Sequence, residues 1–225
     1  MNSAWTEIKT ALGMRAINRP WPFRTAAVLS VAALCLLGSL ARASMAVQTV
    51  AVGQVLRGHF VQDRQLAGFA RSLRSEGSFV LVPGTGLIWR GEKPFANTTV
   101  ITSGGIVQLA GNREAMRLPA SQLPGLSRLY DVLGSALSGN IAPLRQTFAV
   151  EQKSEADQWE IVLTPLQTSA AAQLKSLTLA GHHFVETVEV DHGGGDVDRI
   201  SFSDQVVAQA EPTADEKSLL QILRK

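Results

Sequence analysis

Cysteine is nearly absent from this sequence of 225 residues, and the single one, Cys35, lies in an apolar segment near the N-terminus. One cysteine excludes both an intrachain disulfide and a cysteine-ligated metal cluster. Aromatic residues are also scarce, at 6%, and charged residues make up 18% of the chain. Because 45% of the residues are hydrophobic, the composition is nevertheless that of a folded chain and not of a disordered one.

The sequence also lacks a basic region outside its N-terminal part. The formal net charge is +2, but residues 1–43 hold five cations and one anion, so the rest of the chain carries two more anions than cations. Electrostatic binding of nucleic acid is therefore disfavoured.

Residues 1–43 have the pattern of a secretory signal peptide. Basic residues precede an uncharged run of 16 residues, 25–40, which ends at the small-residue sequence Ala41-Arg42-Ala43. The run is shorter than the about 20 apolar residues of a membrane-spanning helix. We expect cleavage before Ser44, which leaves a single domain, 44–225, without cysteine and suited to an oxidising compartment. The alternative is an uncleaved anchor with its basic end inside the cell.

Beyond residue 44, apolar runs of strand length recur between turn residues. Ser78–Val82 (SFVLV) runs into Pro83-Gly84-Thr85-Gly86, and Leu87–Arg90 (LIWR) follows, which is typical of a β-hairpin. Short connections of this kind favour antiparallel pairing. Further strands are expected at 58–62, 98–102, 106–109, 145–150, 159–163, 176–179, 184–190 and 200–202.

Three segments predict helices. Within 118–137, leucines and a tyrosine recur at spacings of three and four and form one apolar face. Residues 46–56 and 213–223 are shorter candidates, the second with a possible capping pair, Thr213 and Glu216. Together these elements predict a mainly β (α+β) fold, one strongly curved antiparallel sheet with short helices on its concave side.

Few residues suggest a metal site. His182, His183 and His192, with aspartates nearby, have a conceivable ligand spacing. The same histidines also fit the turns at the two ends of the strand 184–190, which is the interpretation we favour. We therefore expect no metal.

Signals for catalysis are equally weak. No G-x-S-x-G elbow marks a serine hydrolase, and Gly84-Thr85-Gly86 lacks the third glycine and the following helix of a dinucleotide site. Arg71 and Arg74 fit a solvated strand edge, the alternative being contact with a lipid headgroup. We expect neither an enzyme nor a cofactor.

The first hairpin has apolar side chains on both faces. Ser78–Val82 and Leu87–Trp89 do not alternate cleanly between polar and apolar residues. Either the hairpin is enclosed between two layers of the protein, or it belongs to an apolar concave face that a mobile helix covers, with room for a lipid.

Longer stretches resemble a known family. They are GHFVQDRQL from Gly58, SEGSFVLVPGTGLIWRGEKPF from Ser75, WEIVLTP from Trp159 and D-x-I-S-F from Asp198. In their order and spacing, and behind a signal peptide, they resemble the periplasmic outer-membrane lipoprotein carrier (LolA) family, particularly its LolA-like branch.

The resemblance implies an incomplete β-barrel whose cavity carries the acyl chains of a lipoprotein across the periplasm of a Gram-negative bacterium. The carrier would be a monomer that receives its cargo from an inner-membrane transporter and passes it to an outer-membrane receptor. By this resemblance the cavity wall consists of Phe60, Phe79, Leu81, Leu87 and Trp89, and helix 118–137 is a lid whose Leu126, Leu129 and Leu133 face the cavity. On this basis we expect Leu87→Glu to stop lipid carriage without unfolding the sheet.

One position departs from the best-known branch of the family. Where those members carry an arginine that hydrogen-bonds the lid, this sequence has Pro83, which has neither a side-chain donor nor a backbone N–H. The departure leaves open how the lid is controlled and whether the cargo is a lipoprotein or another envelope lipid. The alternative function is a lipid-binding or scaffold domain that is anchored at the inner membrane and does not shuttle.

Overall fold

Eleven strands form one antiparallel sheet in the part of the chain that this computed structural model describes, residues 47–122, 126–155, 157–166 and 174–223. The strands are β1 (Val55–Gln65), β2 (Leu73–Val82), β3 (Gly86–Lys93), β4 (Asn97–Thr102), β5 (Gly105–Ala110), β6 (Arg113–Pro119), β7 (Phe148–Glu155), β8 (Gln158–Pro165), β9 (Ser176–Gly181), β10 (Val185–Gly193) and β11 (Asp196–Ala208). The mainly β, antiparallel fold expected from the sequence is confirmed. The predicted signal peptide, 1–43, lies outside the described residues.

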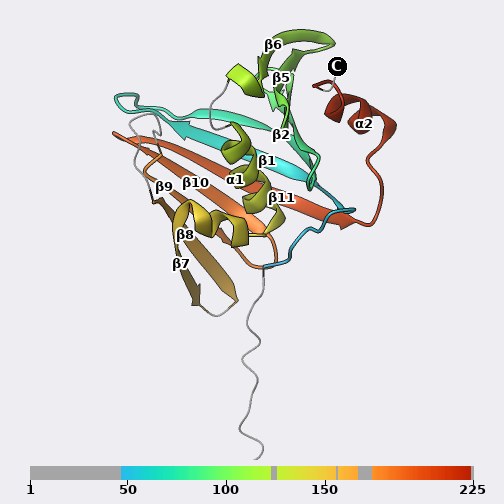
Figure 1. The fold of residues 1–225 in the computed structure, drawn as a ribbon. Coiled ribbons are helices and arrows are strands. Elements are labelled where there is room, and N and C mark those ends of the chain that lie inside the picture. The colour runs from blue at the N-terminus through green and yellow to red at the C-terminus, as the bar shows by residue number, and fades with distance from the viewer. Residues whose placement is uncertain (1–46, 123–125, 156, 167–173, 224–225) are drawn as a thin grey trace, which may run out of the picture. The chain divides into compact units, whose positions relative to one another are not determined.

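The strand order is β6-β5-β4-β3-β2-β1-β11-β10-β9-β8-β7, so the sheet consists of two meanders joined at its centre. The joint is the pairing of the first strand, β1, with the last, β11. Strands β6 and β7 form the two edges and do not pair with each other, so the sheet is open. Figure 1 shows the two meanders, green to cyan and orange to yellow, on either side of this central pair.

The helix α1 (Leu126–Ser138) belongs to the connection between the two edge strands, with the short 3-10 turns η1 (Ala120–Gln122) and η2 (Ala142–Gln146) on either side. Because β6 and β7 lie at opposite edges, this connection has to cross a face of the sheet, and α1 lies across that face in Figure 1. We call the side that carries α1 the inner face. A backbone hydrogen bond of 2.8 Å from Val50 N–H to the Ser138 carbonyl holds the C-terminal end of the helix.

Alternation along β2 separates the apolar residues into two clusters. Phe79 and Leu81 belong to the large cluster on the inner face, whereas Val80 and Val82 belong to a smaller one on the outer face. The second helix, α2 (Ala214–Leu220), packs its Leu220 into the outer cluster. The apolar residues of this hairpin are therefore buried on both faces of the sheet, and in the described part of the chain each face carries one α-helix.

The predicted cap of α2 is confirmed and has a further role. Thr213 accepts a hydrogen bond from the Glu216 N–H, and the Glu216 carboxylate accepts one from the Thr213 N–H. Glu216 is buried and also forms two hydrogen bonds with Arg57 of β1, at 2.9 and 2.7 Å. This ion pair ties the C-terminal helix to the centre of the sheet.

Two helix predictions need correction. Of the segment 46–56, residue 46 lies outside the described part, 47–54 are not helical, and 55–56 open β1. The backbone N–H groups of Gln48 and Val50 bond to the carbonyls of His183 and Ser138, so tertiary contacts take the place of helical hydrogen bonds. The predicted helix 118–137 begins too early, because residues 118 and 119 still belong to β6.

Candidate functional site

A cavity of about 390 Å³ lies between α1 and the inner face of the sheet. Its volume is in the range of about 300–1,000 Å³ that is typical of small-molecule sites. Six strands, β1, β3, β4, β9, β10 and β11, contribute most of the sheet side of the wall, and α1 contributes the other side. The lining residues are Gln62, Leu87, Trp89, Thr99, Ile101, Val132, Leu133, Ala136, Leu137, Leu174, Leu177, Val188, Val190, His192, Ile200 and Phe202.

The wall of this cavity is almost entirely apolar. Thirteen of its sixteen lining residues have aliphatic or aromatic side chains, and the other three are Gln62, Thr99 and His192. None of the sixteen is an aspartate, glutamate, lysine or arginine. Such a surface favours the hydrocarbon part of a ligand, because burial of apolar area is its main source of binding free energy.

An aromatic cluster supports one side of the cavity. The rings of Trp89 and Phe60 stack with their centroids 3.8 Å apart and their planes at 28°. Phe202 meets the Trp89 ring edge-on at 6.1 Å and the Phe79 ring at 5.2 Å. Trp89 and Phe202 line the cavity, whereas Phe60 and Phe79 are buried beneath them. The buried pair therefore fixes the positions of the two rings that a ligand would touch.

A polar cluster lies beside the apolar wall. Asp198 of β11 is only 5% exposed, and Arg64 of β1 donates to its two carboxylate oxygens from Nε at 2.6 Å and Nη2 at 2.7 Å. His192 Nε2 lies 3.0 Å from Asp198 Oδ2, and Gln62 Nε2 donates to Oδ1 at 3.5 Å. Burial acts to raise the pKa of Asp198, but the hydrogen bonds from Arg64 and His192 outweigh it and lower that pKa, so the carboxylate stays ionised at neutral pH.

The chain matches a family of known proteins over most of its length. The model of the family described as outer membrane lipoprotein carrier protein LolA-like matches residues 37–221. The chain belongs to the LolA-like family.

The solved structures that this LolA-like chain matches have low sequence identity to it and TM-scores below 0.5. A LolA superfamily protein from Nitrosomonas europaea is 12% identical, with a TM-score of 0.41 over 76% of this chain and 92% of that one. The MucA/MucB complex of Pseudomonas aeruginosa contains a chain that is 13% identical, with a TM-score of 0.42 over 74% of this chain and 55% of that one. None of the curated proteins compared with the sequence matches it.

The structure brings three of the eight expected site residues to the cavity wall of this LolA-like protein, namely Leu87, Trp89 and Leu133. Phe60 and Phe79 lie in the buried layer behind them. The side chains of Leu126 and Leu129 lie outside the described part of the structure, although their backbone belongs to α1.

Leu81 lies at a different place. It borders a second cavity, of about 280 Å³, together with Pro83 on the sheet side and Ser135 and Ser138 on α1. Pro83, where the resemblance led us to expect a departure from the family, thus lies across a gap from the helix. A proline side chain has no donor with which to bridge that gap.

The part of the wall that comes from the last two strands was not predicted from the sequence. Val188 and Val190 of β10 and Ile200 and Phe202 of β11 line the cavity. The signal was present in their spacing of two residues, which places each pair on one face of its strand. Nothing in the sequence indicated that β11 would pair with β1 and so bring these residues beside the first hairpin.

The histidines do not form a metal site in the described residues, where no three His, Cys, Asp or Glu side chains are grouped closely enough to hold an ion. His182 Nδ1 lies 2.9 Å from Glu186 Oε2, and this hydrogen bond raises the pKa of His182. Among the same described residues, no helix is long and apolar enough to cross a membrane.

Proposed function

We propose that this protein is a periplasmic carrier that shelters the acyl chains of a lipoprotein, or of a related envelope lipid, for transfer toward the outer membrane. The observation that supports it most directly is the apolar cavity of about 390 Å³ between the sheet and α1. Membership of the LolA-like family, whose proteins are periplasmic and bind lipids or lipoproteins, supports the same function.

The physical need for such a cavity follows from the properties of acyl chains. Each methylene group removed from water contributes about 0.8 kcal/mol, so a chain of about fifteen contributes on the order of 12 kcal/mol. A lipid therefore leaves a membrane for water very slowly unless a protein covers its chains. An apolar wall that lacks charged side chains supplies this cover.

Release requires that the cavity not hold its cargo too tightly. Leu133 and Ala136 of α1 face the cavity, and Ala136 also belongs to the inner apolar cluster. We propose that cargo and these helix residues compete for the same surface of the sheet. The net affinity is then a difference between two burials, which a partner at either membrane can shift.

The proposal assigns roles to the residues expected from the sequence. Leu87, Trp89 and Leu133 contact the cargo, and Phe60 and Phe79 hold the aromatic wall in place. Removal of residues 1–43 by signal peptidase releases the domain 44–225 into the periplasm, where it works as a monomer without a cofactor. Its partners are an inner-membrane donor and an outer-membrane acceptor.

Native mass spectrometry of the protein purified from its own periplasm tests this function. We expect part of the protein to carry an additional mass that fragments into an acylated molecule. A protein that is recovered entirely free of lipid, and that takes up no acyl chain from detergent-solubilised envelope lipids, would contradict the proposal.

The anchored alternative rests on the N-terminal sequence, where a long basic segment precedes the apolar run 25–40. Uncleaved, this run would hold the domain at the inner membrane, where it would bind lipid without shuttling. N-terminal sequencing of the protein from separated envelope fractions distinguishes the two. A chain beginning at or near Ser44 in the soluble fraction favours the carrier, and an intact N-terminus in the membrane fraction favours the anchored domain.

A further inference from the structure

The hairpin formed by β1 and β2 projects beyond the strands on either side of it. The pairing of β2 with β3 begins at Glu76, although β2 itself already begins at Leu73. On the other side, the pairing of β1 with β11 ends at Gln65, opposite Val197. Figure 1 shows this hairpin ending beside the hairpin of β10 and β11. We call residues 66–74, the connection and the first two residues of β2, the β1–β2 tip.

Two apolar side chains of the β1–β2 tip are exposed to solvent. Phe69 is 65% exposed and Leu73 is 61% exposed. Residues two apart along a strand share a face, so Leu73 lies on the same, inner face of β2 as Phe79 and Leu81. A single exposed apolar residue is ordinary, but two in one short projecting segment favour contact with an apolar partner.

Hydrogen bonds hold the backbone of the tip in one conformation. The Phe69 N–H donates to the Leu66 carbonyl at 3.1 Å, and Gln65 Nε2 donates to the Phe69 carbonyl at 2.7 Å. The Ala67 N–H donates to Asp196 Oδ1, at the start of β11, also at 2.7 Å. Because the loop is ordered before any contact, a partner that binds Phe69 does not have to order it.

The charged residues of the tip are both cationic. They are Arg71 and Arg74, and both are exposed. Arg74 Nη1 lies 3.2 Å from Asp63 Oδ2, whereas Arg71 has no ion pair with another described residue. A free guanidinium group binds phosphate oxygens well, because its N–H groups match their geometry.

This combination of side chains suits the surface of a lipid bilayer. Aromatic and aliphatic side chains enter the boundary between headgroups and acyl chains, and nearby arginines are attracted to anionic lipids. A protein partner could also cover Phe69. The presence of two cations and no carboxylate within residues 66–74 favours an anionic lipid surface instead.

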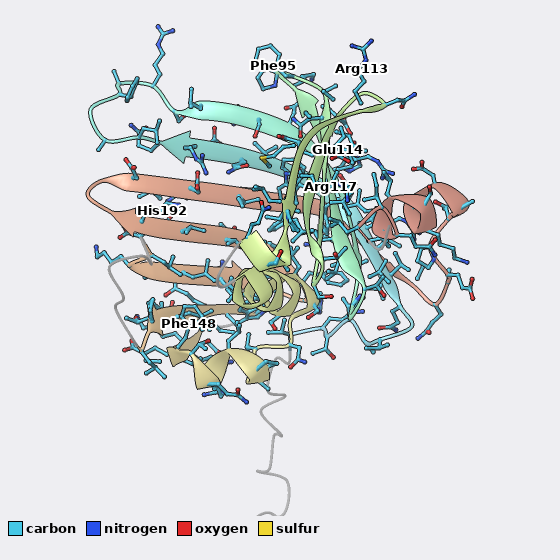
Figure 2. The ribbon with its side chains drawn as sticks, turned by 45° about the horizontal axis from the view of Figure 1, so that its top comes forward. Phe95, Arg113, Glu114, Arg117, Phe148 and His192 are labelled. Atoms are coloured by element: carbon cyan, nitrogen blue, oxygen red, sulfur yellow. The ribbon has the colours of Figure 1, made fainter. Side chains whose placement is uncertain are left out.

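The cavity extends toward the same end of the sheet. Gln62, on β1 four residues before Leu66, contributes to its lining. His192 also lines it, and Figure 2 shows this residue near the end of the hairpin of β10 and β11. A membrane in contact with the β1–β2 tip is therefore on the side of the molecule to which this part of the cavity points.

We propose that the β1–β2 tip docks the protein on a bilayer that contains anionic phospholipids. Phe69 and Leu73 enter the headgroup region, and Arg71 binds a lipid phosphate. Docking in this orientation brings the end of the cavity at Gln62 and His192 close to the membrane with which acyl chains are exchanged. The inference rests on the proposed function for its purpose, but docking itself can be measured without any cargo.

The test is sedimentation of the protein with lipid vesicles. The protein is purified from the soluble periplasmic fraction and stripped of lipid, and wild type and variants share the same N-terminus. One kind of vesicle is phosphatidylcholine alone, and the other is an equal mixture of phosphatidylcholine and phosphatidylglycerol. The variants are Phe69→Ser and Arg71→Gln. The matched control is Val206→Ser, which removes a 62% exposed side chain near the opposite end of β11.

We expect Phe69→Ser to weaken binding to both kinds of vesicle about tenfold, because an apolar ring no longer leaves water. Arg71→Gln should weaken binding to the mixed vesicles about fivefold and leave binding to phosphatidylcholine unchanged. Val206→Ser should change neither. Pyrene, a fluorescent hydrocarbon, reports on the cavity, and its displacement by glycerol monolaurate should be the same in all these proteins, because none of the three residues lines the cavity.

Several results would overturn the inference. They are a wild type that sediments with neither kind of vesicle, a Phe69→Ser variant that binds as the wild type does, and equal losses in Phe69→Ser and Val206→Ser. Arg71→Gln losing the same affinity for both kinds of vesicle would refute the contact with phosphate. If vesicles bind as expected but glycerol monolaurate does not displace pyrene from the wild type, the proposed function falls and the docking surface stands.

Discussion

Filling the cavity should stabilise the protein and at the same time weaken ligand binding. Val190 is suited to this test, because its side chain lines the cavity and is only partly buried, so a larger residue can extend into open space. Phenylalanine has a strand propensity similar to that of valine. We therefore choose Val190→Phe, which places a ring in the cavity without adding a polar group.

The magnitudes follow from the cavity volume. Phenylalanine is about 50 Å³ larger than valine, and at about 24 cal/mol per Å³ of cavity filled it stabilises the lipid-free protein by about 1 kcal/mol. The same ring takes space from a cavity of about 390 Å³. The excluded volume corresponds to about two methylene groups at about 0.8 kcal/mol each, so the affinity for an acyl chain should fall about tenfold.

Urea unfolding followed by circular dichroism measures the stability, and displacement of pyrene by glycerol monolaurate measures the affinity. The matched control is Val206→Phe on β11, where the valine is 62% exposed and outside the cavity, so both quantities should stay unchanged. A Val190→Phe variant that is less stable than the wild type and binds the lipid equally well would refute the reasoning. That result would mean that the space beside Val190 is neither open nor used by the ligand.

The remaining predictions concern the attachment of the two helices. Gly139 follows α1 with φ = +69°, and a Cβ there would lie 2.7 Å from Val47 Cγ1. Gly139→Ala should therefore lower the free energy of unfolding, measured in urea, by about 1–2 kcal/mol. The control Gly134→Ala, whose Cβ would have no neighbour within 4 Å, should not lower it, and equal effects of the two substitutions would contradict the tight packing at Gly139. At neutral pH, Glu216→Gln should cost about 1–2 kcal/mol, because Arg57 loses its ionised partner. The hydrogen bond from Arg57 lowers the pKa of Glu216 below its usual 4.5, so this contribution is present above pH 4.5 and is lost as the pH falls through the lowered pKa. The difference in the free energy of unfolding between wild type and Glu216→Gln should therefore shrink in acid. A difference that stays constant down to pH 2 would contradict the role assigned to the ionised Glu216.

The hairpin formed by β2 and β3 could be predicted because all its signals are local. Strand residues on both sides of a proline–glycine turn define the pairing, and Leu81 indeed lies opposite Leu87 in the sheet. Local information did not show that Val80, Val82 and Ile88 of the same hairpin belong to a second apolar cluster, into which α2 packs Leu220. The two interpretations of the hairpin do not exclude each other. The hairpin is enclosed, with α1 on one side and α2 on the other, and its inner face also lines an apolar cavity.

The edge strand β6 was not predicted, because its residues are mostly polar and exposed and do not alternate between polar and apolar. This composition follows from its position at the edge of the sheet, which the sequence does not reveal. An edge strand has no neighbour on one side, and charged residues there protect it from pairing with other chains. Glu114 and Arg117 on this edge strand, both labelled in Figure 2, form an ion pair through two hydrogen bonds. A sequence search for alternating apolar residues passes over such a strand and assigns its last residues to the following helix.

Leu87 is a predicted site residue whose burial means that a substitution there affects stability as well as binding. It lines the cavity, but it is only 2% exposed and belongs to the inner apolar cluster. A glutamate at this position would have to be buried or neutralised, at a cost of several kcal/mol. Contrary to the expectation from the sequence, we therefore expect Leu87→Glu to disrupt the sheet, so that loss of lipid carriage in that variant would not identify a contact.

The topology also determines how α1 can move. The helix lies in the connection between the two edge strands, so the chain is tethered to the sheet on both sides of it, and a displacement of α1 cannot release it from the domain. Near its C-terminal end, the bond from Val50 to Ser138 and the close contact at Gly139 hold it in place. The neighbouring Ala136 and Leu133 face the cavity, where a hydrocarbon chain can replace the apolar surface that they cover. Pro83 provides no side-chain hydrogen bond to α1 across the adjoining gap. On this side, α1 and the cargo therefore compete for the sheet through apolar contacts, and each gains a similar free energy per unit of buried apolar area.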